Sequence, residues 1–158
     1  MTNQGNTTRP IVYLTTHDIA WINTTVTSRQ NHYDWVKLEA AMAAQYQYGE
    51  SHDITAQAAG LLNALLLRPP WPEGIRRTAL IALASFLAAN GVRWTAEPEV
   101  LASHICGVAT HQLSARQGLT QILDGSTFGP PPEASLRQVI AAQCAALAEA
   151  LITLANGD

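Results

Sequence analysis

The chain has 158 residues, of which 47% are hydrophobic and 13% are charged, and its net charge is −3. This length suits one domain with its own core, and the thin surface charge is typical of a protein that a partner partly covers. The charge balance argues against bulk electrostatic binding to nucleic acid or to a membrane surface.

The first ten residues are polar and lack the apolar run of a signal peptide, and no stretch reaches the roughly 18–20 apolar residues of a transmembrane helix. Cys106 and Cys144 stand apart among apolar neighbours, which indicates buried free thiols in a reducing compartment. We therefore expect a cytoplasmic protein whose residues 1–10 are extended or disordered.

Capping signals and apolar periodicity predict helices along most of the chain. Ile11–Leu14 is a short strand or an extended lead-in, and a T-x-x-D pattern at Thr15 starts a first helix over about 16–28. A second helix is predicted over about Trp35–Ala44. Tyr alternation among turn residues in 45–53 favours a small β-hairpin or flap.

The middle of the chain predicts four more helices. Thr55 caps an apolar third helix, and the prolines at 69, 70 and 72 delay the fourth to about Glu73, from which it runs to Asn90-Gly91. Pro98 lies in the first turn of a fifth helix that runs to about residue 110. An S-x-x-Q pattern at Ser114 opens a sixth helix that ends near residue 123.

Residues 125–133 form a Gly- and Pro-rich linker, and residues 134–156 predict one long helix with a single apolar stripe. That added helix packs either on its own bundle or on a second subunit. The predicted fold class is all-α: a core of about six helices over 11–124, at most one small hairpin, and the extra C-terminal helix.

The start of the fourth helix carries a possible anion site. Free backbone N–H groups and the helix dipole meet there, Gly74 removes a side chain, and Arg76 and Arg77 add fixed positive charge. Glu73 has a side chain able to hold a divalent cation between phosphate oxygens. An alternative is an arginine pair that only solvates the start of a buried helix.

The stretch PPWPEGIRRTA, from Pro69 to Ala79, resembles the motif of Fic-domain proteins in their Doc (death-on-curing) branch, typically His-Pro-Phe-x-[Asp/Glu]-Gly-Asn-Lys-Arg-Thr-Ala. The segments YLTTHDI, KLEAAMAAQYQYG, GLLNALL and WTAEPEVLASHICGVATHQLS are similar to the flanking Doc segments in the same order, so that the likeness spans roughly residues 11–124.

The resemblance implies a compact helical bundle with a flap, and transfer of AMP or phosphate from a nucleoside triphosphate to a protein hydroxyl. It assigns Glu73 to the metal-binding acid, Gly74 to the phosphate cradle, Arg77 to the phosphate-binding arginine and Arg76 to the lysine position. Residues 45–51 would form the flap that aligns the target chain.

Two departures remove the expected chemistry. The catalytic histidine position holds Pro69, which has no basic side-chain atom, and the phosphate-contacting asparagine position holds Ile75. Loss of a general base typically costs a factor of about 10²–10⁴ in rate. The five histidines considered as a replacement base are His17, His32, His52, His104 and His111.

Three interpretations follow. The first is a catalytically inactive Doc-like protein that keeps a remnant nucleotide or phosphate pocket at Gly74, Arg76 and Arg77, and acts on a protein partner in a toxin–antitoxin or regulatory setting. The second is a divergent but active AMP- or phosphotransferase with a non-standard base, using ATP or another nucleoside triphosphate with Mg²⁺. The third is a structural oligomer that associates through the C-terminal helix.

Overall fold

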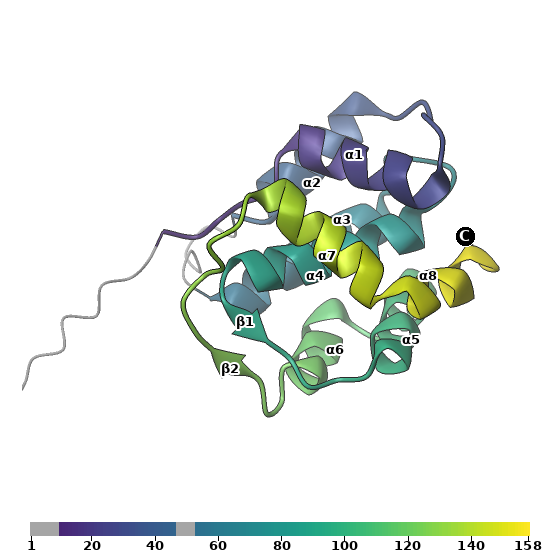
Figure 1. Cartoon of the computed structure of the whole chain (residues 1–158). Coiled ribbons are helices and arrows are strands. Elements are labelled where there is room, and N and C mark those ends of the chain that lie inside the picture. Colours follow the sequence, from purple (N-terminus) through teal and green to yellow (C-terminus); the bar gives the residue numbers. More distant parts are fainter. Residues whose placement is uncertain (1–9, 47–52) are drawn as a thin grey trace, which may run out of the picture.

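Two apolar helices, α3 (Ile54–Leu67) and α4 (Ile75–Ala89), form the centre of the fold, and the other helices pack around them (Figure 1). The computed structural model describes residues 10–46 and 53–158. Every residue of α4 from 78 to 87 is buried. A helix that is apolar on nearly all sides needs neighbours on all sides, which explains its central place.

Four helices cover this central pair. Helices α1 (Thr16–Thr27) and α2 (Trp35–Ala44) lie on one side, whereas α5 (Pro98–Ala109) and α6 (Ala115–Ile122) lie on the other (Figure 1). Within the described residues, helices dominate and the strands are two residues long. The prediction of an all-α protein is confirmed.

The local start signals explain where most helices begin. Thr15 and Asp18 form a reciprocal capping box at α1, and the carboxylate of Asp34 caps α2. The predicted cap at Thr55 is wrong: Asp53 accepts the N–H of Ala56, so α3 begins earlier than expected. Helix α4 begins at Ile75 rather than near Glu73, because the Gly74 backbone is left-handed there.

A two-stranded antiparallel sheet joins β1 (Val92–Arg93) to β2 (Thr127–Phe128), which lies inside the predicted linker. It extends from a turn at Gly91, whose carbonyl accepts the N–H of Gly129 at 2.9 Å. No local sequence pattern predicts the pairing of β1 with β2. Most of the predicted flap or hairpin, residues 47–52, lies outside the described residues.

Ile11–Leu14 is an extended lead-in and not a strand. The backbone of Leu14 pairs with the buried side-chain amide of Gln45, which accepts its N–H at 3.0 Å and donates to its carbonyl at 2.7 Å. An amide side chain presents both an N–H donor and a carbonyl acceptor, as a neighbouring strand would. The Gln45 side chain thereby satisfies the hydrogen-bonding groups of the buried Leu14 backbone, although no strand among the described residues pairs with it.

The single helix predicted over 134–156 is wrong. The segment forms α7 (Leu136–Ala146) and α8 (Ala148–Ala155), which meet at an angle of 71°. Helix α7 lies on α4 and α1, where Arg137 stacks over the Trp21 ring at 4.4 Å, whereas α8 turns onto α5 (Figure 1). Leu147 is buried at the bend, so packing on two different helices overrides the continuous apolar stripe.

No single helix in the described residues is long and apolar enough to cross a membrane; α7 and α8 meet the length and composition only as a bent pair. Cys106 and Cys144 are free thiols, as expected, but both are only half-buried. Burial raises the pKa of the Cys144 thiol.

Candidate functional site

The loop before α4 is fixed against the segment that joins α1 to α2. The Pro70 carbonyl accepts the N–H of Asp34 at 2.9 Å, and the buried Trp71 ring donates its Nε1–H to the Asn31 carbonyl at 3.3 Å. Pro69, in contrast, is exposed. The loop therefore holds the start of α4 in a defined place and leaves the Pro69 ring at the surface.

Gly74 is the N-cap of α4, and its close surroundings require glycine. Its φ is +73°, and an added Cβ atom would lie 2.3 Å from the Thr27 Cγ2 methyl. The Gly74 carbonyl accepts both the N–H and the hydroxyl of Thr78, at 2.9 and 2.7 Å. Because Gly74 has no side chain, the first N–H groups of the helix stay accessible to an acceptor.

A buried amide reinforces this turn from α1. The Asn23 side chain donates to the Glu73 carbonyl at 3.2 Å and to the Thr78 hydroxyl at 3.1 Å, and it accepts from Asn31 at 3.0 Å. Asn23 is 1% exposed, so these bonds satisfy an amide that would otherwise be costly to bury. The network links α1, the loop and α4 through hydrogen bonds.

The anion position at the start of α4 is occupied by a carboxylate of the same chain. Asp158 accepts the backbone N–H of Arg76 at 2.7 Å and that of Arg77 at 3.2 Å, and its Oδ2 also accepts the Arg77 Nε–H at 2.8 Å. Its side chain is fully buried. Two helix N–H groups, the positive end of the dipole and a guanidinium thus converge on one anion.

Arg77 is held in this orientation from its other end. Its Nη1–H donates to the Val26 carbonyl at 2.9 Å, and its side chain is 19% exposed. The guanidinium therefore bridges the end of α1 and Asp158. A fixed, partly desolvated arginine is the arrangement that binds an anion most strongly, because little motion is lost on binding.

The other predicted site residues do not converge on this anion. The Arg76 side chain places its Nη1 atom 3.8 Å from the Cys106 sulfur, and Arg76 hydrogen-bonds Asp158 through its backbone N–H. Glu73 pairs with Arg29, and both side chains are more than half exposed. Among the described residues no three His, Cys, Asp or Glu side chains gather into a metal site. The metal role predicted for Glu73 stays a prediction.

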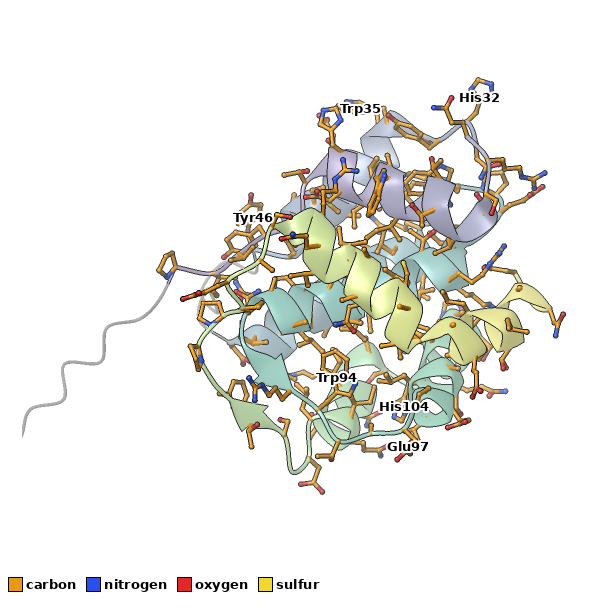
Figure 2. All side chains as sticks on the ribbon, in the orientation of Figure 1. His32, Trp35, Tyr46, Trp94, Glu97 and His104 are labelled. Atoms are coloured by element: carbon orange, nitrogen blue, oxygen red, sulfur yellow. The ribbon has the colours of Figure 1, made fainter. Side chains whose placement is uncertain are left out.

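The histidines fall into three groups. His17, His32 and His111 are exposed, whereas the His104 ring is bound between the Val100 carbonyl and the Gln121 side chain; His52 lies outside the described residues. Figure 2 shows His32 and His104 at opposite sides of the molecule. His32 lines a hollow of about 450 Å³. Trp71, which follows Pro69 and Pro70 in the chain, also lines it.

Sequence reasoning placed Gly74, Arg76 and Arg77 at the anion site, and it missed Asp158. In the sequence, Asp158 is an acidic residue that directly follows the Asn-Gly pair after α8. An acidic residue at such a place gives no sign that it is buried or bound to α4. Only the 71° bend between α7 and α8 brings it to α4.

In comparisons with known proteins, no family model matches the chain, and neither a curated protein nor a solved structure matches it. The likeness to Fic-domain proteins therefore rests on the motif and on the order of the flanking segments.

Proposed function

We propose that this chain is a catalytically inactive protein with a Doc-like helical core, which acts by binding and keeps a remnant phosphate pocket at the start of α4. Two features support the proposal. Pro69 brings no base to the position where the resemblance expects one, and the anion site is filled by the chain's own carboxylate. The contact of Asp158 with Arg76 and Arg77 carries the argument, because a nucleotide phosphate would need the same donors.

Calorimetry with ATP and Mg²⁺ tests this function, comparing the natural chain with Asp158→Ala. We expect no measurable heat with the natural chain and weak binding by the variant, whose donors are free. Neither protein should transfer label from ATP to another protein. Label transfer by the natural chain at an enzymatic pace would overturn the inactive interpretation. Tight binding of ATP to the natural chain would contradict the part of the proposal in which Asp158 fills the phosphate pocket.

The second candidate is an active AMP- or phosphotransferase, and His32 is the observation that favours it. This imidazole is exposed and shares a hollow with Trp71 of the motif loop. A base must approach the attacking hydroxyl within hydrogen-bond reach, and a loop histidine can move to do so.

Incubation with ATP labelled at the α- or γ-phosphate, with a cell lysate as the source of substrate, separates the two candidates. The active interpretation expects labelled protein bands that disappear in His32→Ala and Arg77→Ala but persist in His111→Ala, the matched change of an exposed histidine. We expect no labelled bands with any of the four proteins.

A further inference from the structure

An apolar groove of about 530 Å³ runs between α2 and α3, on a different part of the surface from the α4 anion site. Four of its lining residues are small, and we refer to them as its floor: Ala40, Ala44, Gly60 and Ala64; the polar Asn63 also lines the groove. Large side chains would hold a neighbouring helix at a distance, whereas alanine and glycine let a helix backbone come close. The floor therefore suits a helix better than it suits a flat surface.

Large apolar side chains stand exposed beside this floor. Val36 and Leu67 line the groove and are 74% and 40% exposed. Tyr33 and Trp35, which precede Val36 in the chain but do not line the groove, are also exposed, and their ring centroids lie 6.2 Å apart with the rings tilted. Trp35 lies at the outer edge of the molecule in Figure 2. Apolar side chains gathered around a hollow mark interaction sites, whereas single scattered ones do not.

The charges that line the groove are all positive. Lys37 and Arg68 line it, neither forms an ion pair with a described residue, and no Asp or Glu is among the described lining residues. The net charge of the whole chain is −3, so the charge that lines the groove is opposite in sign to that of the chain. Complementary charge at a rim steers the encounter and rejects partners of the wrong sign.

We propose that the α2–α3 groove binds an amphipathic helix of another protein, with an apolar stripe flanked by Asp or Glu. This deepens the proposed binding role by naming the surface and the chemical class of partner. The ten residues of α2 span about 15 Å, enough for roughly three turns of a bound helix. Such a helix would set residues at i, i+3, i+4 and i+7 over the floor and its acids against Lys37 and Arg68.

A second copy of this chain fits less well. In a two-fold symmetric dimer the same patch meets itself, which would bring Lys37 and Arg68 of one subunit toward those of the other. Like charges facing across an apolar contact oppose association.

Selection from a displayed library of helical peptides about 20 residues long, on the full chain, tests the proposal. We expect enriched peptides with an apolar stripe and acidic flanks, whose Kd is then measured by fluorescence anisotropy. Val36→Glu, Leu67→Glu and Lys37→Glu should each weaken binding at least tenfold. Ile152→Glu is the matched control, because Ile152 is 69% exposed on α8, and it should leave the Kd unchanged.

The proposal fails if no helical peptide is enriched, if the enriched peptides carry basic or uncharged flanks, or if their binding is unaffected by both Val36→Glu and Leu67→Glu. A concentration-dependent dimer in light scattering that Val36→Glu abolishes would assign the groove to a second copy and also overturn it. ATP binding by Asp158→Ala is measured separately, so the proposed function and the peptide groove can each fail while the other stands.

Discussion

Arg77 and Asp158, 81 residues apart in the chain, are joined by a 2.8 Å hydrogen bond between Nε and Oδ2. The same carboxylate receives two backbone N–H groups at the start of α4, so one buried side chain satisfies three donors. This contact anchors the end of α8 to the central helix. It also places a negative charge at the start of α4, where the motif resemblance predicts a phosphate, so that C-terminal packing and the predicted anion site share one contact.

Asp158→Ala is expected to lower the free energy of unfolding by about 1–3 kcal/mol. The substitution leaves two helix N–H groups and the Arg77 guanidinium without their shared acceptor. Phosphate or sulfate should restore part of the loss, because an ion that binds only the folded state stabilises it by mass action. Thermal and urea unfolding with added phosphate, against chloride at matched ionic strength, measures both effects.

The natural chain is the control for that rescue and should gain little from phosphate, since its site is already filled. Asp158→Asn, which keeps the shape and removes the charge, should show an intermediate loss of stability. An alanine variant as stable as the natural chain, with no response to phosphate, would show that the carboxylate contributes nothing.

Arg77→Lys should destabilise the fold by about 1–2 kcal/mol although it keeps the positive charge. The guanidinium contacts Asp158 and the Val26 carbonyl through two different nitrogens, and a lysine ammonium is too compact to bridge both. A double-mutant cycle of Arg77→Lys with Asp158→Ala should give a coupling energy of about 0.5–3 kcal/mol. The Arg76 side chain forms no hydrogen bond with Asp158, so Arg76→Lys should show no coupling. Equal coupling energies for both arginines would contradict the assigned role of Arg77.

Elements with strong local signals were predictable from the sequence. The second helix was predicted over about Trp35–Ala44, and the structure has these bounds; the Asp34 side-chain cap that fixes its start is a local interaction as well. The start of α1 follows from the Thr15–Asp18 capping box in the same way. In both cases the deciding interaction joins residues three positions apart.

Features that depend on distant residues were not predictable. The apolar stripe over 134–156 is compatible with one helix, and only the positions of α4 and α5 make the bend at Leu147 favourable. The start of α4 as an anion site was inferred from Gly74, Arg76 and Arg77, whereas its occupant, Asp158, follows α8 and reaches the site through that bend. Local patterns therefore give the donors of the site but not the acceptor.

The raised pKa of Cys144 predicts a pH dependence of stability. Burial disfavours the thiolate, so the pKa in the folded state lies above the ordinary value of 9.0. The stability linked to this thiol is fully present below the pKa of the unfolded chain, and it is lost as pH rises through the folded pKa, because the unfolded chain releases its proton first.

In Cys106→Ser, which leaves Cys144 as the only thiol in the sequence, iodoacetamide should therefore react more slowly with the folded chain than with the chain in urea. The rate with the folded chain should continue to rise above pH 9. Urea unfolding of this variant and of Cys144→Ser with Cys106→Ser, compared between pH 7 and pH 10, checks the linkage. An alkylation rate for the folded chain that levels off at the same pH as that of the unfolded chain would contradict it.

Gly74→Ala should destabilise the fold more than a left-handed backbone alone explains. An alanine at φ +73° is strained, and its Cβ would in addition lie 2.3 Å from the Thr27 methyl. Gly125→Ala is a matched control, because Gly125 has the same φ of +73° and its added Cβ would meet only a Thr95 atom at 3.8 Å. We expect a loss of about 1–2 kcal/mol for Gly125→Ala and a clearly larger one for Gly74→Ala in urea unfolding. Thr27→Ser removes the methyl group, so adding it to Gly74→Ala should recover part of the difference in stability between the two glycine variants. Equal losses of stability at both glycines, with no recovery by Thr27→Ser, would show that the loop before α4 moves to accommodate the new Cβ atom and does not hold the start of α4 in place.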